Sequence, residues 1–276
     1  MTRIAIAQTC SGIDPQANAA ALVAAVAAAA DGGAAMLFMP EMCGLLDGNR
    51  TRAAAHVRAQ ADDPTLKALC DAAAAHKIWL HIGSLALLSE AGDGRFVNRG
   101  FVIDDAGKIV AHYDKMHLFD VDLPTGESWR ESSTYAPGAR AVVAETPLGR
   151  LGLSICYDQR FPALYAGLSA AGAQVLSVPA AFTVPTGKAH WHVLLRARAI
   201  ENASFVIAAA QYGTHEDGRA TFGHSLVISP WGEVILDMGE GVGVGFADMD
   251  LAQVDDVRSR IPVIRHRRTI PEAVSG

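Results

Sequence analysis

Short apolar runs alternate with helical segments along this chain, and no other feature constrains its fold as much. Residues 3–9 alternate as a strand does, with Ile4 and Ile6 on one face, and Asp14 then precedes an alanine-rich helical segment that ends at Gly32. The apolar run 36–39, ended by Pro40, is typical of a strand buried on both faces. The pattern therefore predicts parallel β-α-β units and an α/β fold.

The same alternation continues through the rest of the chain. Apolar residues recur at helical spacing within two further segments, and Pro162 is placed to begin another helix. Continuous apolar runs between these segments predict buried strands. Helices are expected over 64–76, from 162 onward and over 190–201, and strands over 78–85, 151–155, 175–178, 205–210 and 246–250.

Two segments, 101–110 and 226–235, share one pattern with a glycine at the same place, which predicts a β-hairpin in each. Each half of the chain therefore combines α/β alternation with a hairpin, and we expect two similar sheet-and-helix layers packed together. No Pro/Ser-rich linker separates the halves, so residues 1–276 are expected to form one domain. Residues 252–276 are rich in arginine and poor in large apolar residues, and we expect them to form a tail at a subunit interface or in solvent.

Composition excludes several classes of function. The chain has a net charge of −6 and no basic stripe, so neither nucleic acid nor an anionic membrane surface is an expected partner. Its most apolar N-terminal run, 19–30, is shorter than the roughly 20 residues that a membrane-spanning helix needs. Residues 1–8 do not resemble a signal peptide, and a cytoplasmic location is therefore expected.

The cysteines direct attention to one position. Four cysteines in 276 residues are too few for a disulfide scaffold, and they form no C-x-x-C pair. Cys156 lies between a predicted buried strand and a predicted helix, where a sharp turn can expose a nucleophile and free backbone N–H groups for an oxyanion. A buried structural cysteine fits this local pattern equally well. Cys70 is expected in the core, and Cys10 and Cys43 lie in loops without an activating neighbour.

A thiol needs a base and a nearby cation to become an effective nucleophile. Glu41 directly follows the buried run 36–39, and Lys115 follows another predicted strand. Taken singly, either residue is more often a surface charge. Together with Cys156, they form a candidate catalytic set at the ends of strands.

These residues and their flanking motifs resemble the nitrilase superfamily of carbon–nitrogen hydrolases, whose catalytic set is a Glu, a Lys and a Cys in that order. The resemblance spans nearly the whole chain and implies a four-layer α-β-β-α sandwich, no cofactor, and a homodimer or larger homo-oligomer. The motifs that carry it are Phe38-Met-Pro-Glu41, Lys115-Met-His-Leu-Phe-Asp120, Ser154-Ile-Cys-Tyr-Asp-Gln-Arg-Phe161, Thr186-Gly-Lys-Ala-His-Trp191, Arg196-Ala-Arg-Ala-Ile-Glu201 and Gly223-His-Ser-Leu-Val-Ile-Ser-Pro-Trp-Gly232.

The resemblance also implies roles for the individual residues. Glu41 would take the proton of Cys156 as the sulfur attacks a carbonyl carbon, and would later activate water. Lys115 and the backbone N–H of Tyr157 would stabilise the tetrahedral oxyanion. A second glutamate would hold the lysine in place, and we assign it to Glu131, with Glu127 as the nearby rival.

A metal centre is not expected. His112, His117, His215 and His224 show neither H-x-x-x-H spacing nor pairing with cysteine. The glycine-rich segment 241–245 precedes a predicted strand rather than a helix, so it is not a phosphate-binding loop.

The residues around the nucleophile favour an amide over a nitrile, because Tyr157-Asp158 resembles the amidase branches of the superfamily. Segments 182–191 and 218–224 are most similar to the Nit subgroup, whose members act on deaminated glutathione or, in the related ω-amidase, on α-ketoglutaramate. His192 departs from this subgroup, which commonly has Glu at that position. A member of the fold that serves only as a binding scaffold is the alternative from another functional class.

Arg160 leads to a prediction about the substrate. Its guanidinium, four residues past the nucleophile, is expected to grip the carboxylate of a short dicarboxylate acyl group. Phe182 and Thr186, placed on the loop after the next strand, are expected to line the acyl pocket. An ion pair between Arg160 and a nearby acidic residue that only supports the loop is the alternative.

Overall fold

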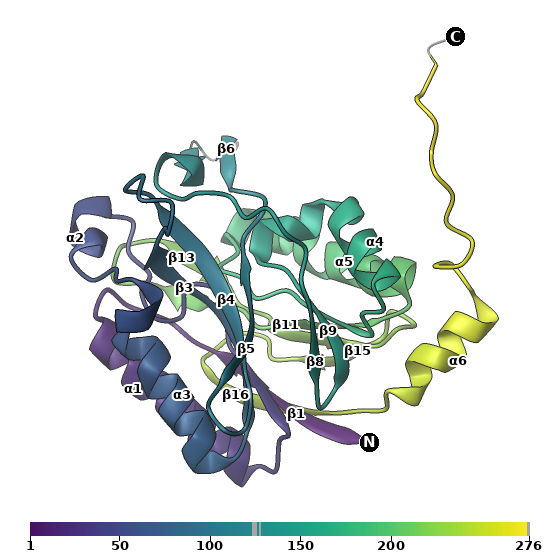
Figure 1. The fold of residues 1–276 in the computed structure, drawn as a ribbon, viewed down its shortest axis with the longest axis horizontal. Helices are drawn as coiled ribbons and strands as arrows, with labels where there is room; N and C mark the ends of the chain where they lie inside the picture. Colours follow the sequence, from purple (N-terminus) through teal and green to yellow (C-terminus); the bar gives the residue numbers. More distant parts are fainter. Residues whose placement is uncertain (123–125, 127, 275–276) are drawn as a thin grey trace.

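Two six-stranded β-sheets pack face to face between helices in the computed structural model, which describes residues 1–122, 126 and 128–274 (Figure 1). The first sheet combines the strands of the N-terminal half with one strand from near the C-terminus. Its three central strands are parallel, and its other neighbours pair antiparallel. In spatial order it consists of β16 (Gly243–Met249), β1 (Thr2–Gln8), β2 (Met36–Phe38), β3 (Trp79–Leu88), β4 (Phe96–Ile103) and β5 (Ile109–Asp114).

The second sheet repeats this arrangement. It also has three parallel strands with a hairpin on one side and a single antiparallel strand on the other. The expectation of two similar layers is confirmed at the level of strand topology. In spatial order the sheet consists of β15 (Val234–Asp237), β14 (Leu226–Ile228), β11 (Phe205–Ala208), β10 (Val175–Ser177), β9 (Gly149–Leu153) and β8 (Val143–Thr146).

The two hairpins, β4–β5 and β14–β15, occupy equivalent places in their sheets. They confirm the prediction of a hairpin in each of the segments 101–110 and 226–235. Their turns contain Gly107 and Gly232, with φ of 78° and 88°. Side chains with a Cβ atom rarely adopt this left-handed region, so glycine at these turns follows from the backbone geometry.

Helices α1 (Pro15–Asp31) and α3 (Pro64–His76) cover the outer face of the first sheet. The Asp14 carboxylate accepts the Gln16 N–H at 2.9 Å, and the Asp63 carboxylate accepts the Leu66 N–H at 2.7 Å. Each helix therefore begins with an acidic N-cap followed by proline, and Asp14 is where the sequence pattern predicts the start of the first.

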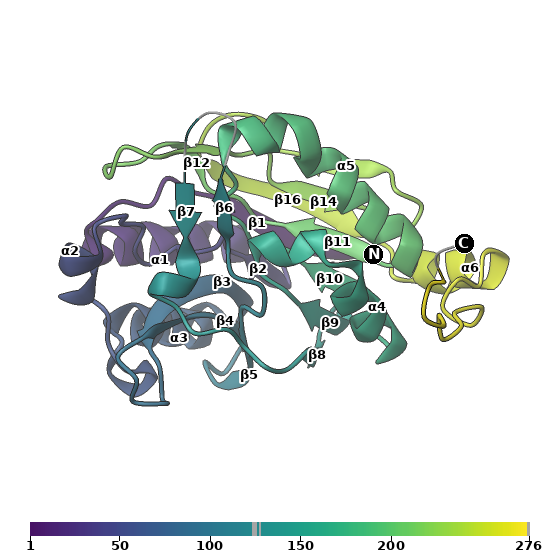
Figure 2. The same cartoon turned by 90° about the horizontal axis from the view of Figure 1, so that it is seen from above.

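Alternate residues of β1 show the order of the layers. Ile4 and Ile6 belong to the core that also contains the second sheet, whereas Ala5 and Ala7 belong to the core under α1 and α3. Both faces of the strand are buried. The order is therefore helices, sheet, sheet, helices, which confirms the expected four-layer sandwich (Figure 2).

Helices α4 (Pro162–Ala170) and α5 (Val184–Asn202) cover the outer face of the second sheet. The sequence pattern predicts a helix over 190–201, but α5 begins six residues before that range. Pro185 and Gly187 suggest a loop, yet proline fits the first turn of a helix, and Gly187 packs so closely on Phe222 that a Cβ there would lie 2.2 Å from the ring.

Short elements form the rim around the ends of the parallel strands. Two small antiparallel sheets pair β6 with β7 and β12 with β13. The rim elements are α2 (Arg50–Ala54), η1 (Gln60–Asp62), β6 (Asp120–Asp122), β7 (Ser128–Arg130), η2 (Glu131–Ser133), η3 (Cys156–Arg160), β12 (Tyr212–Thr214) and β13 (Ala220–Phe222).

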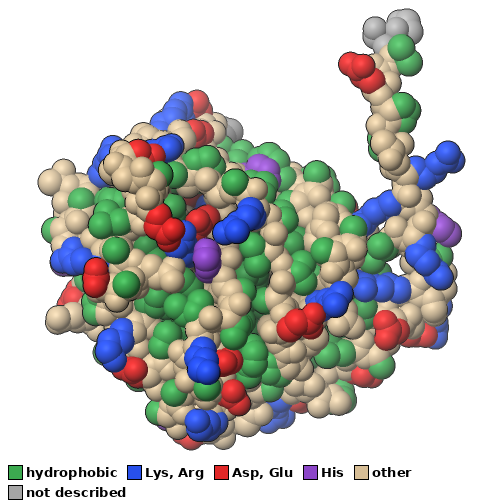
Figure 3. Space-filling model, in the orientation of Figure 1, with side chains coloured by type: hydrophobic (Ala, Val, Ile, Leu, Met, Phe, Trp, Pro, Cys, Tyr) green, Lys and Arg blue, Asp and Glu red, His purple; other side chains and the backbone are tan. Residues whose placement is uncertain are grey.

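The C-terminal segment differs in part from the expected tail. It begins with helix α6 (Ala252–Arg260), whose Val254 and Val257 are buried. Arg258 and Arg267 reach back to the main body, where Arg258 donates to the Ala173 carbonyl at 2.6 Å and Arg267 to the Ala166 carbonyl at 2.7 Å. The last part of the chain extends away from the body (Figure 1), and basic side chains gather near its start beside α6 (Figure 3). None of the helices in the described residues is long and apolar enough to span a membrane.

Candidate active site

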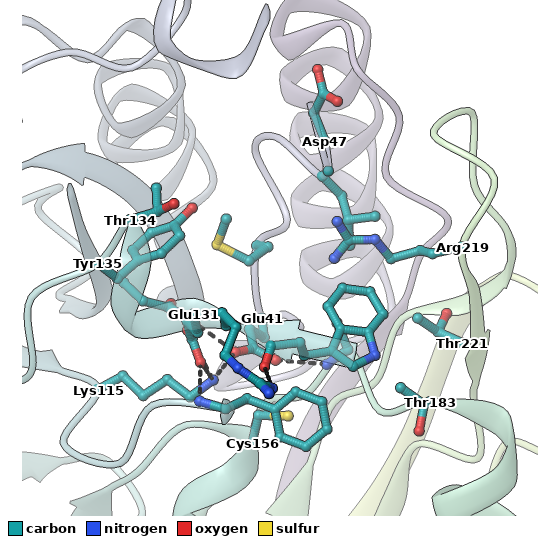
Figure 4. A pocket seen from close by; sticks show the side chains of 18 of the residues that line it. Glu41, Asp47, Lys115, Glu131, Thr134, Tyr135, Cys156, Thr183, Arg219 and Thr221 are labelled. Carbon is teal, nitrogen blue, oxygen red and sulfur yellow. Dashed lines mark hydrogen bonds and ion pairs between the residues drawn. The ribbon is translucent and has the colours of Figure 1, made fainter. Parts of the chain in front are cut away.

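The three residues of the predicted catalytic set follow three different strands and meet in one cavity of about 500 Å³ (Figure 4). Glu41 follows β2 and Lys115 follows β5, both in the first sheet, whereas Cys156 follows β9 in the second. The sandwich therefore brings together groups that are far apart in the sequence.

Lys115 is the electrostatic centre of this cluster. Its Nζ donates to Glu41 Oε1 at 2.9 Å and to Glu131 Oε2 at 2.8 Å. The side chains of Lys115, Glu41 and Glu131 are only 3%, 5% and 14% exposed, so water screens these ion pairs weakly. One ammonium shared by two carboxylates leaves a net negative charge beside the Cys156 thiol.

Further hydrogen bonds fix both carboxylates. Asn98 Nδ2 donates to Glu41 Oε1 at 3.0 Å and to Glu131 Oε1 at 3.2 Å. The Ala181 N–H donates to Glu41 Oε2 at 2.8 Å, and the Phe119 N–H donates to Glu131 Oε2 at 2.7 Å. Groups held in this way lose little orientational freedom when a substrate binds.

Cys156 stands at a sharp turn between β9 and η3. Its φ is +49°, an uncommon conformation for a residue other than glycine. Its N–H donates to the Pro179 carbonyl at 2.8 Å, and the buried Asp158 carboxylate accepts the Ile155 N–H at 2.8 Å and the Tyr113 hydroxyl at 2.7 Å. These bonds anchor the turn from both sides and hold the thiol at the cavity floor.

Gly83 in β3 allows the segments around Glu41 and Cys156 to approach each other. A Cβ at this position would lie 2.2 Å from the Met39 carbonyl oxygen and 2.5 Å from Pro179 Cβ. Met39 precedes Glu41 by two residues, and Pro179 accepts the Cys156 N–H. A side chain at residue 83 would therefore separate the base from the nucleophile.

The site holds a protonated thiol beside a charged carboxylate. Burial raises the pKa of Cys156 well above its ordinary value, and the Glu41 charge adds to this effect. Burial alone would raise the pKa of Glu41, but the charge and hydrogen bond of Lys115 outweigh it and hold that pKa below 4.5. Burial acts against the charged form of Lys115, yet Glu131 and Glu41 raise its pKa well above 10.5. Glu41 is therefore ready to accept the thiol proton.

Two of the three predicted substrate contacts lie on the cavity wall. Phe182 and Thr186 both line the cavity, but Thr186 is in the first turn of α5 rather than in a loop. Its hydroxyl lies 2.7 Å from the Thr183 hydroxyl. The Tyr157 side chain packs edge-on against Phe119, with ring centroids 5.1 Å apart. The backbone N–H of Tyr157 belongs to the residue directly after the nucleophile.

The cavity wall gives no support to the predicted contact of Arg160 with substrate. Arg160 is not among the residues that line the cavity. Its guanidinium carbon lies 5.4 Å from the centre of the Phe182 ring, and Nη2 is 3.3 Å from His190 Nδ1. The tight η3 turn carries the side chain behind Phe182, so proximity in sequence to the nucleophile does not place it in the site.

Other arginines line the cavity instead. Arg219 projects into it from the loop before β13 (Figure 4). Its Nε donates to Asp217 at 2.8 Å, and its guanidinium carbon lies 5.1 Å from the Trp129 ring centre. Arg50 also lines the cavity, and its Nη1 donates to the Ser133 carbonyl at 3.0 Å. Among the described residues, Arg50 forms no ion pair with a carboxylate.

The remaining candidates lie elsewhere. Glu127, the rival of Glu131, falls outside the described residues. His117 lies against Asp158, with Nδ1 2.7 Å from the carboxylate, and His215 Nε2 is 2.8 Å from the Thr221 hydroxyl. Neither histidine contacts Cys156, so the structure gives no support to a Cys–His dyad at the proposed nucleophile.

Comparison with known proteins places this site in a family. The carbon–nitrogen hydrolase family matches residues 3–259. The chain belongs to this family. It is 36% identical over 272 residues to the deaminated glutathione amidase of Yersinia enterocolitica, across 98% of this chain and 94% of the relative.

Solved structures agree with this membership. The NitFhit protein of C. elegans superposes with a TM-score of 0.89 at 39% identity, across 97% of this chain and 65% of that chain. A mutant of the amidase from Nesterenkonia sp. AN1, which shows covalent addition of the acetamide moiety of fluoroacetamide at the active site cysteine, superposes with a TM-score of 0.81. It is 27% identical across 97% of this chain and 94% of that chain.

In this carbon–nitrogen hydrolase, two groups of the site were missed by sequence reasoning. Asn98 is a polar residue in β4, all of whose residues are buried, and such a residue in a buried strand is a signal for a functional role. Arg219 follows a turn and carries no comparable signal. Only the folded hairpin β12–β13 places it at the cavity.

Proposed function

We propose that this chain is an amidase that hydrolyses a small linear amide through a thioester on Cys156. One observation carries the proposal: a protonated thiol, a charged carboxylate and a buried ammonium meet in a cavity of about 500 Å³. This volume falls in the range of about 300–1,000 Å³ that is typical of sites for small molecules. A scaffold protein has no need to keep these costly buried charges together.

The proposed acylation step uses each of these groups. As Cys156 Sγ bonds to the amide carbon, the thiol proton passes to Glu41, and the carbonyl electron pair moves onto oxygen. Lys115 Nζ and the Tyr157 N–H stabilise this oxyanion. When the tetrahedral intermediate collapses, the C–N bond breaks and Glu41 returns the proton to the leaving amine.

In the proposed deacylation step, Glu41 takes a proton from a water molecule whose oxygen attacks the thioester carbon. The C–S bond then breaks, the sulfur recovers a proton, and the acid product leaves. Glu131 and Asn98 act as positioning residues, because they hold Lys115 and Glu41 by the hydrogen bonds described above. The balance is one amide and one water giving one carboxylic acid and one amine.

We propose deaminated glutathione as the substrate, with 2-oxoglutarate and Cys-Gly as products. This compound bears one carboxylate on its acyl half and another on its leaving group. Arg219 and Arg50 supply two cationic groups on the cavity wall, and a planar guanidinium binds a carboxylate through paired hydrogen bonds. Arg219 replaces Arg160 in this role. The name of the Yersinia enterocolitica relative supports the same substrate.

The second candidate is an ω-amidase that acts on α-ketoglutaramate. It shares the acyl half but releases ammonia, so it needs only one carboxylate contact. Three arginines line the cavity, Arg50, Arg130 and Arg219, so more than one cation can face a carboxylate, and this favours the substrate with two carboxylates.

Steady-state kinetics with both amides tests this proposal. We expect kcat/KM to be higher for deaminated glutathione. Arg219→Lys is expected to lower it by about 10- to 100-fold, because lysine cannot form the bidentate bond that is worth about 1.5–3 kcal/mol. Arg160→Lys serves as the matched control and should change it less than threefold. A preference for simple aliphatic amides, or equal effects of the two substitutions, would leave an amidase of another substrate class.

We also propose a homodimer paired through α5. Val193 and Ile200 are 68% and 50% exposed and lie seven residues apart, on the same side of the helix. Trp231, 56% exposed, lies in the adjacent hairpin turn, where Arg196 donates to the Gly232 carbonyl at 2.8 Å. A second copy of the chain would cover this apolar surface, and the extended residues after α6 would contact it.

A cytoplasmic location completes the proposal. All four cysteines are free thiols, and the proposed nucleophile must stay reduced to work.

A further inference from the structure

Two histidines and one aspartate converge at the outer surface between α5 and the hairpin β14–β15. His192 lies on α5, His224 lies two residues before β14, and Asp237 ends β15. His192 Nε2 is 3.0 Å from Asp237 Oδ2, and His224 Nδ1 is 2.9 Å from Asp237 Oδ1. One potential ligand atom from each residue lies within 4.8 Å of the other two. None of the three lines the substrate cavity.

We propose that His192, His224 and Asp237 form a binding site for a divalent transition-metal ion of the Zn²⁺ class. Imidazole nitrogens and a carboxylate oxygen are the ligands that such ions prefer. A tetrahedral ion about 2.1 Å from each ligand atom separates neighbouring ligand atoms by about 3.4 Å. The present separations of 3.0 Å and 2.9 Å need only a small rotation of the rings to reach that spacing.

The surroundings restrict the ligands to nearly the required orientation. The Gly239 N–H donates to Asp237 Oδ1 at 2.8 Å, and the Trp191 indole N–H donates to the His224 carbonyl at 2.8 Å. The His224 ring stacks on Phe222 with centroids 4.5 Å apart, and Phe222 is itself held against Gly187 of α5. Such support around the ligands is a feature of functional metal sites.

The cluster of His192, His224 and Asp237 is open to solvent and differs from other groups of close polar side chains in offering three ligands. The side chains of His192, His224 and Asp237 are 36%, 24% and 32% exposed, so an ion can enter from solvent. In the part of the chain that the structure describes, no second cluster of three His, Cys, Asp or Glu side chains has this spacing. Cys10 Sγ lies 3.6 Å from His215 Nδ1, but this pair offers two ligands rather than three.

The same three residues can also form a simple hydrogen-bonded clasp, in which each imidazole donates an N–H to Asp237. A metal ion would take the place of those N–H bonds once each imidazole carries its proton on the other ring nitrogen. Bound there, it would join α5 to β15 behind Phe222, whose neighbours in β13 line the cavity. It would stabilise the fold without entering the amide chemistry, and the inference is independent of the proposed function.

Metal binding to the full chain tests this inference directly. Tag-free protein is stripped with EDTA and dialysed against Zn²⁺, and the bound metal is measured per chain. Co²⁺ is then used as a spectroscopic probe, since a four-coordinate ion gives intense visible bands. We expect one equivalent of bound metal per chain and a higher Tm with Zn²⁺ than without it. The visible bands of bound Co²⁺ should be those of a four-coordinate ion with imidazole ligands.

Variants decide which residues bind the ion. His192→Gln and Asp237→Asn should each weaken binding at least about tenfold, as losses around metal sites typically do. His76→Gln, at an exposed histidine of α3, and Cys10→Ser should leave the bound equivalent unchanged. Absence of a bound equivalent in the parent protein, or its retention in both cluster variants, would overturn the inference. Amidase assays of the same variants report separately on the proposed function.

Discussion

Glu41→Gln separates the role of the base from that of the nucleophile. The amide keeps the shape of the carboxylate, and its oxygen can still accept hydrogen bonds from Lys115 and Asn98. Lys115 keeps its second partner, Glu131, at 2.8 Å. The fold should therefore survive, while the group that receives the thiol proton is removed.

The expected losses follow from the pKa values in the site. General-base catalysis contributes about 10²–10⁴ in rate, and Glu41 is proposed to act in both acylation and deacylation. We therefore expect kcat/KM to fall at least about 10³-fold, equivalent to about 4 kcal/mol. The Glu41 charge raises the pKa of the Cys156 thiol. Its removal lowers that pKa, so the thiol should be alkylated at lower pH than in the parent protein.

Two assays on the same protein measure these effects. Amide turnover is followed by release of the amine, and the pH dependence of Cys156 alkylation by iodoacetamide is followed by mass spectrometry. Glu233→Gln, at an exposed glutamate near the other end of the second sheet, is the control. Turnover within tenfold of the parent, or an alkylation midpoint that does not move to lower pH, would refute the assignment of Glu41 as the base.

Three further predictions concern chemistry, stability and assembly. Cys156→Ala should abolish turnover, and adding Glu41→Gln should lower the residual rate little further, because the effects of residues that act as a unit are not additive. The activity of the parent protein should survive EDTA and be lost on treatment with iodoacetamide. Burial lowers the pKa of His81 to about 3 from 6.5. Between these values the unfolded chain binds a proton that the folded chain excludes, so the free energy of unfolding should fall on acidification by up to about 1.4 kcal/mol per pH unit. His81→Phe should reduce that slope in urea titrations, and an unchanged slope would assign it to other groups. Ile200→Glu should shift the dimer to monomer in light scattering, and a stable dimer would exclude pairing through α5.

Local patterns predicted much of this fold. Asp14-Pro15 and Asp63-Pro64 mark the starts of α1 and α3, because a cap and a fixed proline φ act within a few residues. Continuous apolar runs locate the central strands, because a strand covered on both faces needs apolar side chains at successive positions. The start of α5 was missed because Pro185 and Gly187 are ambiguous without knowledge of Phe222, the side chain that fills the space above the glycine.

The candidate site was predictable only where its residues follow strands. Glu41, Lys115 and Cys156 share that position, and the resemblance to a family linked them. Arg160 was expected in the site because it lies four residues past Cys156, but sequence spacing does not reveal that its side chain packs against Phe182 and His190. His192, His224 and Asp237 come together only through the packing of α5 on the hairpin β14–β15, so no sequence spacing indicates the cluster.

The division of the site between the two sheets has a thermal consequence. Glu41 and Lys115 move with the first sheet, whereas Cys156 moves with the second. Each sheet is held internally by its own ladder of backbone bonds, whereas the two sheets are joined by side-chain packing and scattered hydrogen bonds, such as Tyr113 to Asp158 and the Ala181 N–H to Glu41. A slip of about 1 Å between them costs about 10² in rate while exposing little apolar surface. On gentle heating, the turnover rate is therefore expected to fall before the circular dichroism signal changes, and to recover on cooling. Loss of activity would then measure a shift between the two sheets rather than unfolding of either one.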